Sequence, residues 1–213
     1  MSVRAAASTT TLNPATRAWL WGGSAILVSG LLRMLEALPL TAMVGSGPVT
    51  LMAATAFALG VVILALGVRR QGSLVARSGL GMTAMFVLAA LDIVQAAIVE
   101  LFPSISPHLR DAVTGLSDGV VLLQLAAAVV ASLVIARAGA VRGALRWLPL
   151  VALACVVALQ VLVRVVLQAR GGLALSGPDV LVVTQVAIAL LTSTLGLTLM
   201  LASPRAAQAA RDE

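Results

Sequence analysis

The chain has 213 residues, of which 61% are hydrophobic and only 10% are charged, and its mean hydropathy is +1.09. This composition excludes a water-soluble globular protein, whose surface needs far more charge. The apolar residues come in blocks of about twenty, the length at which an α-helix crosses a hydrocarbon core of about 30 Å, and not in the alternating segments of an outer-membrane barrel.

Charge and reactive residues exclude further classes of protein. The chain has no lysine, which rules out a retinal-type Schiff base and, together with the many arginines, is typical of a GC-rich bacterial genome. A single Cys155 and a single His108 form neither an intrachain disulfide nor a protein-only metal or bis-histidine haem site, so we expect no cofactor. The net charge of +6 lies in short segments between apolar blocks, which favours membrane topology over a nucleic-acid partner.

Six apolar segments predict six transmembrane helices. The first begins at Asn13-Pro14, a capping residue followed by proline at the first helical position, and Pro39 closes it. A cleaved secretory signal is the alternative for this segment, but its apolar stretch continues past Arg33 and Glu36 without a small-residue cleavage site. The predicted spans cover residues 18–38, 49–68, 80–102, 119–137, 148–168 and 180–202.

One membrane domain, residues 18–203, is predicted between a short N-terminal segment, 1–17, and a short C-terminal tail, 204–213. The connections are short except for residues 103–118, where His108, Arg110 and Asp111 lie and where we expect a small surface helix. The fold class is therefore an all-α bundle of six transmembrane helices.

Consecutive spans pair into three αα-hairpins, and similar turns indicate an internal repeat. Arg33 is followed after thirteen residues by a Ser-Gly-Pro turn at 46–48, and Arg164 is followed after twelve by the same tripeptide at 176–178. Either an old duplication or the general accumulation of these residues in tight turns explains the similarity.

The distribution of arginine predicts that both termini are cytoplasmic. Positive side chains flank transmembrane helices mainly on the cytoplasmic side, and this orientation puts ten arginines in inner segments against Arg110 and Arg170 in outer loops. We therefore expect a multi-pass protein of the cell membrane. The ten inner arginines are Arg4, Arg17, Arg69, Arg70, Arg77, Arg137, Arg142, Arg146, Arg205 and Arg211.

Charged and amide side chains within the spans are the candidate site residues. A charge near the middle of a transmembrane helix costs about 2.5 to 3.5 kcal/mol on insertion scales, so such groups normally face inward and have partners. At about 1.5 Å of rise per residue, the two arginines and Asp92 lie in the outer half of the bundle. The candidates are Arg33, Glu36, Asp92, Gln95, Glu100, Gln160 and Arg164.

Two interpretations of these charges stay open. In the first, Arg33 and Arg164 are neutralised by Asp92, Glu36 and Glu100 in a network that only fixes helix register. In the second, the charges line an outer pocket in which Asp92 binds a cation or relays a proton. Glu36 and Glu100 lie near span ends, so their side chains could also extend to the outer surface.

The sequence favours a non-catalytic membrane subunit or scaffold that contacts other membrane proteins, or further copies of itself, through its helices. The first alternative is a small channel or transporter that uses Asp92, Arg33 and Arg164. The second is an outer-leaflet lipid-acting enzyme, for which His108 would have to face an aspartate, although a lone loop histidine is more often merely solvated. Cys155 lies in an apolar run and is expected to be buried and unreactive.

Overall fold

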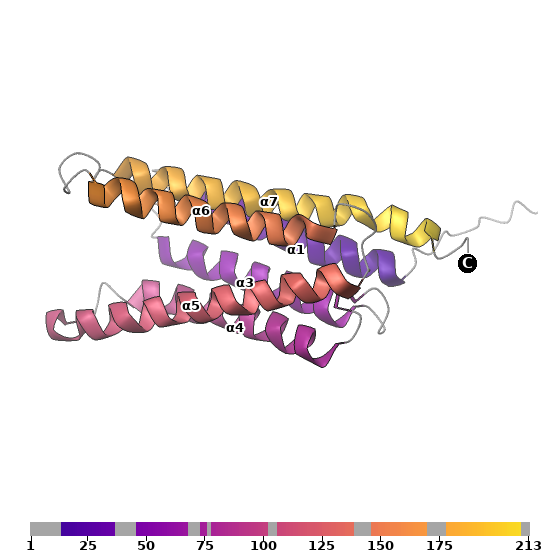
Figure 1. Cartoon of the computed structure of the whole chain (residues 1–213), viewed down its shortest axis with the longest axis horizontal. Coiled ribbons are helices and arrows are strands. Elements are labelled where there is room, and N and C mark those ends of the chain that lie inside the picture. The colour runs from indigo at the N-terminus through magenta and orange to yellow at the C-terminus, as the bar shows by residue number, and fades with distance from the viewer. Residues whose placement is uncertain are drawn as a thin grey trace, which may run out of the picture.

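The computed structural model describes residues 14–36, 46–67, 73–75, 78–101, 106–138, 146–169 and 178–209. Within these ranges the chain forms an all-α bundle, which confirms the predicted fold class, and its helices run side by side along the long axis (Figure 1). Five helices are long and apolar enough to cross a membrane, and α6 has a shorter apolar segment in its described part. The helices are α1 (Pro14–Glu36), α3 (Ser46–Leu66), α4 (Gly79–Leu101), α5 (Pro107–Ala138), α6 (Leu148–Ala169) and α7 (Pro178–Ala209).

Most helix bounds lie within two residues of the predicted spans, and the first helix begins at Pro14 as predicted. The α3 helix begins at Ser46, three residues before its predicted span. Pro48 is tolerated there because it lies in the first turn, where a backbone N–H would have no acceptor within the helix. The capping Asn13 and the closing Pro39 lie outside the described residues.

Two helices are longer than their predicted spans. Instead of a separate surface helix in 103–118, α5 is continuous from Pro107, because Gly115 and Gly119 each cost a helix only about 1 kcal/mol. The α7 helix continues past Ala202, where its apolar segment ends, through position 204 to Ala209. Proline removes one hydrogen bond and need not end a helix.

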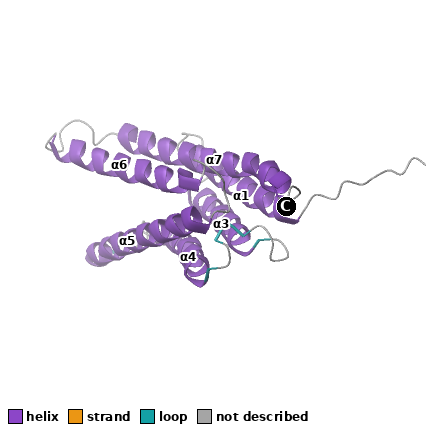
Figure 2. Cartoon of the chain, turned by 45° about the vertical axis from the view of Figure 1, so that its right-hand side comes forward, coloured by secondary structure: helices purple, strands orange, loops and turns teal. Residues whose placement is uncertain are grey.

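The helices form a curved row in the order α6, α7, α1, α3, α4, α5, and α1 is the central member. Its packing against α7 and against α3 is the most extensive in the bundle, whereas α5 and α6 meet only sparsely. Figure 2 shows the α6–α7 pair diverging from the α4–α5 pair. The helices of each predicted hairpin are therefore in contact, α3 packs against α4 to join the first hairpin to the second, and α1 packs against α7 to join the first to the third.

Glycines allow α1 to approach both neighbouring helices closely. A Cβ atom added at Gly23 would lie 2.9 Å from the carbonyl oxygen of Gly196 on α7, and one at Gly60 on α3 would lie 2.8 Å from that of Gly22. Lipid is as apolar as the helices themselves, so close backbone packing and not hydrophobic burial holds transmembrane helices together. These two glycine contacts fix α1 between α3 and α7.

Candidate functional site

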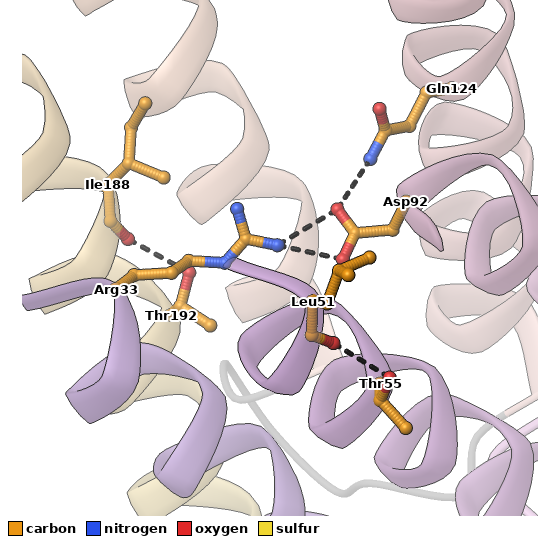
Figure 3. A network of polar contacts seen from close by, with 7 residues as sticks. All are labelled: Arg33, Leu51, Thr55, Asp92, Gln124, Ile188 and Thr192. Carbon is orange, nitrogen blue, oxygen red and sulfur yellow. Dashed lines mark hydrogen bonds and ion pairs between the residues drawn. The ribbon is translucent and has the colours of Figure 1, made fainter. Parts of the chain in front are cut away.

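The candidate site centres on an ion pair between the last turn of α1 and the middle of α4. Arg33 extends toward Asp92, and its Nη2 donates to both carboxylate oxygens, at 2.9 Å to Oδ1 and 2.7 Å to Oδ2 (Figure 3). The Asp92 side chain is 9% exposed and that of Arg33 is 24% exposed. Opposite charges at this distance in a low-dielectric interior neutralise each other, which makes both tolerable inside a membrane.

A third helix completes the network through an amide. Gln124 of α5 donates from Nε2 to Oδ1 of Asp92 at 3.2 Å. Both carboxylate oxygens thus accept hydrogen bonds, and α1, α4 and α5 are joined at one point (Figure 3). We refer to Arg33, Asp92 and Gln124 as the polar network.

Two threonine hydroxyl groups near the polar network are satisfied along their own helices. Thr192 of α7 donates to the carbonyl oxygen of Ile188 at 2.9 Å, and Thr55 of α3 donates to that of Leu51 at 2.7 Å (Figure 3). Such bonds to the preceding turn are the usual solution for threonine in an apolar helix. These two threonines therefore add no further hydrogen bond to the carboxylate.

The two glutamates lie beside α3. The carboxyl group of the half-buried Glu36 is hydrogen-bonded to the Thr50 side chain, and Arg33 and Asp92 are its charged neighbours. The exposed Glu100 lies against Gly47 in the first turn of α3 and occupies the space that a side chain there would need. A carboxylate at this position is favourable, because the helix N-terminus carries partial positive charge.

Gln95 follows Asp92 by one helical turn but does not join the polar network. Its Nε2 donates to the Ser117 hydroxyl of α5 at 2.9 Å, so it forms a second link between α4 and α5. Its Oε1 is buried and has no hydrogen-bond partner among the described residues. Gln95 therefore contributes to helix packing and does not contact the carboxylate.

The remaining predicted site residues lie on α6. Gln160 is exposed and borders a cavity between α5 and α6. The Arg164 side chain lies outside the described part of the chain, so its predicted share in neutralising the carboxylates stays a prediction. Cys155, expected to lie in lipid-like surroundings, is exposed on the surface of α6, because the sparse α5–α6 contact leaves much of this apolar helix uncovered by other helices.

Gln124 is the residue that sequence reasoning left out of the candidate site. Its spacing with Ala128 and Ser132 marks an inward face of α5, and an amide within an otherwise apolar segment is the signal that could have identified it. The sequence could not show that this amide reaches Asp92, because the contact depends on how α5 packs on α4.

A cavity of about 580 Å³ adjoins the polar network through Gln124. All six helices contribute to its wall, which is mainly apolar and contains no charged residue among those described. The polar side chains that line it are Gln124, Gln160, Ser132, Thr192 and Thr198.

Comparison with known proteins finds no matching family model, no matching curated protein and no matching solved structure. Function is therefore inferred from the network, the cavity and the helix surfaces.

Replacing Gln124 with leucine is expected to destabilise the bundle by roughly 1.5 kcal/mol. This is the lower end of the roughly 1.5 to 3 kcal/mol for a hydrogen bond to a charged group, because Asp92 keeps its two bonds to Arg33. The measurement is a denaturant titration in detergent micelles. The control is Gln185→Leu on an exposed face of α7, which should change little, and equal losses in the two variants would contradict the role of Gln124.

Proposed function

We propose that this multi-pass membrane protein is a non-catalytic subunit that acts through helix contacts within the bilayer. The polar network supports this proposal because both oxygens of Asp92 already accept hydrogen bonds, which leaves the carboxylate little capacity to bind a cation. A closed pair of this kind suits the positioning of α1, α4 and α5 better than chemistry. The cytoplasmic location of both termini, based on the arginine count, belongs to the same proposal.

The observation that carries the proposal is a pair of unfilled glycines on α5. Gly115 and Gly119 are exposed, and a Cβ atom at either would have no neighbour within 4 Å. Glycines elsewhere in the helices, such as Gly23, Gly60 and Gly196, are closely approached by a neighbouring helix. The spacing of Gly115 and Gly119 by four residues is that of the small-residue motif at which transmembrane helices pair, here at the end of the apolar segment and next to Asp118.

The face of α5 that bears these glycines continues along the helix. Ala126, Val129 and Leu133 follow at helical spacing and are exposed. Two glycines at one end of this face allow another helix to approach the backbone closely there, and the larger side chains further along the helix can pack against that second helix. The occupant we propose is α5 of a second copy of this chain, because a single self-complementary face is what a twofold dimer requires.

Co-purification tests this pairing. Two copies of the chain with different affinity tags, expressed together and extracted in mild detergent, should purify together. Gly119→Leu should lower the recovered partner several-fold, because a bulky side chain keeps the two backbones apart. The matched control is Gly79→Leu, since Gly79 also has open space at its Cβ position but lies at the start of α4.

Equal recovery with Gly119→Leu and with Gly79→Leu would show that α5 does not mediate self-association. If the parent chain failed to bring down its tagged copy at all, the dimer would be excluded and the glycine face would need a helix of another protein.

The transporter alternative is supported by one observation, the cavity beside Gln124. Because no described charged residue lines its wall, the cavity suits an apolar molecule better than an ion. The enzyme alternative gains no comparable support, because His108, Asp111 and Asp118 are all exposed and lie on the same helix.

A further inference from the structure

We propose that the cavity that opens between α5 and α6 binds one acyl chain of a membrane lipid. The proposal does not rest on the α5 dimer and concerns the side of α5 that faces α6, which adjoins the glycine face at Leu122. It follows from where the cavity opens, how large it is and which groups line it.

The cavity opens within the depth of the membrane. Its exposed lining residues are Val121 and Leu122 on α5 and Gln160 and Val161 on α6, so the opening lies between these two sparsely packed helices. On α6 the opening is twelve residues from Leu148, which is about 18 Å of helix. A hydrocarbon core of about 30 Å extends beyond that point, so lipid tails surround the opening.

The size of the cavity suits a small apolar group. Its volume is about 580 Å³. It lies within the range of roughly 300 to 1,000 Å³ that is usual for small-molecule sites.

The lining favours an uncharged, elongated apolar group. From the opening the wall continues past Ile26 and Leu195 to Trp19 and Leu199, toward the end of the bundle at which α1 begins. The amide groups of the described lining are those of Gln160 at the opening and of Gln124, whose Nε2 donates to Asp92. An apolar void of this size is costly if empty, because its wall loses dispersion contacts, and tails are the nearest apolar molecules available to fill it.

Tryptophan fluorescence can detect the chain inside the cavity, because brominated acyl chains quench tryptophans that they contact. Trp19 lies in the cavity wall and is only 3% exposed, whereas Trp21 is 67% exposed on the same helix. A variant with Trp21→Phe and Trp147→Phe reports on Trp19 alone. The matching variant with Trp19→Phe and Trp147→Phe reports on Trp21, which faces the lipid directly.

Both single-tryptophan proteins are reconstituted into bilayers of phosphatidylcholine brominated near the chain ends, and then into bilayers of unbrominated phosphatidylcholine. We expect Trp19 to be quenched at least half as strongly as Trp21, despite its burial. A bound chain is the route by which bromine reaches Trp19. If Trp21 were strongly quenched and Trp19 were not, the proposal would be overturned. This outcome does not depend on a variant that fills the cavity.

Filling the cavity gives a second, independent measurement. Ala152 lines the cavity on α6, whereas Ala154 is exposed on the same helix and does not line it. Ala152→Phe should reduce quenching of Trp19 at least twofold and leave quenching of Trp21 unchanged, and Ala154→Phe should alter neither. If Ala152→Phe folded and left the quenching of Trp19 intact, the chain would not lie in this cavity.

Discussion

Replacing Gly196 with leucine is expected to separate α7 from α1 and to leave little folded protein. A Cβ atom at this position would lie 2.6 Å from the backbone nitrogen of Leu27 and 2.7 Å from the carbonyl oxygen of Gly23. Both are backbone atoms of α1, so no side-chain rotation can relieve the clash. Overpacking usually costs about 1 to 3 kcal/mol, and we expect a loss at or above the upper end of this range.

The measurement is the monodisperse fraction after detergent extraction, followed by a thermal melt of that fraction. Gly196→Ala should show an intermediate loss, because its single methyl group meets the same atoms of α1. Gly79→Leu is the control for adding a leucine to a membrane helix, since the space around Gly79 is open and this residue lies outside the proposed dimer face. Parental yield and melting temperature for Gly196→Leu would show that the α1–α7 packing does not hold the bundle together.

The sequence was sufficient to predict the number of helices, their class and most of their bounds, because each depends on local properties of the chain. Apolar blocks define the spans, and proline or glycine residues flank them. The end of the α3 helix was predicted to within two residues, but the residue that terminates it was not identified. Gly67 ends the helix with a positive φ of 67°, and its N–H donates to the carbonyl oxygen of Ile63.

The sequence predicted the pairing of consecutive helices, but not which helices bring one hairpin against another. The pairing of α1 with α7 depends on contact between Gly23 and Gly196, which lie at opposite ends of the chain. Hydropathy is similar on both sides of such contacts, because lipid-facing and helix-facing residues are both apolar. The curved order of the helices and the cavity between α5 and α6 are consequences of this packing and could not be inferred from spacing alone.

Two members of the polar network, Arg33 and Asp92, were among the residues predicted from the sequence, but their pairing was not predicted. The free-energy cost of a charged side chain in the membrane was enough to identify Arg33 and Asp92 as residues that need partners. Helix rise placed them at similar depth, but Arg164 was an equally suitable partner by that criterion. The side-chain contact to Arg33 and the third bond from Gln124 depend on the rotation of α1, α4 and α5 about their axes, which the sequence does not specify.

Removing the carboxylate of Asp92 is expected to destabilise the bundle by about 3 to 5 kcal/mol. Asp92→Ala leaves the guanidinium of Arg33 without its counter-ion in a largely buried position, and an uncompensated buried charge has a cost of this size. The loss should exceed that of Gln124→Leu, which removes one neutral donor. A thermal melt in detergent, supported by denaturant titration, measures it.

A double variant distinguishes the effect on stability of removing the whole ion pair from the effect of removing one charge and leaving the other buried. Arg33→Leu combined with Asp92→Leu removes both charges, and replacing a buried ion pair with apolar side chains is often neutral or stabilising. We therefore expect the double variant to recover most of the loss seen with Asp92→Ala. Glu100→Gln is the matched single-carboxylate control, and it should cost at most about 1 kcal/mol, because Glu100 is exposed and loses only its interaction with the N-terminus of α3.

The same variants distinguish a structural carboxylate from one that binds a cation. If Asp92 serves only to neutralise Arg33, the melting temperature of the parent should not depend on the identity of added monovalent cations, and the double variant should remain folded. A transport carboxylate would give the parent a cation-dependent melting temperature, and Asp92→Asn would abolish that dependence while the protein stayed folded. An Asp92→Ala protein that melts with the parent would refute the neutralising role, because Arg33 would then tolerate burial without its partner.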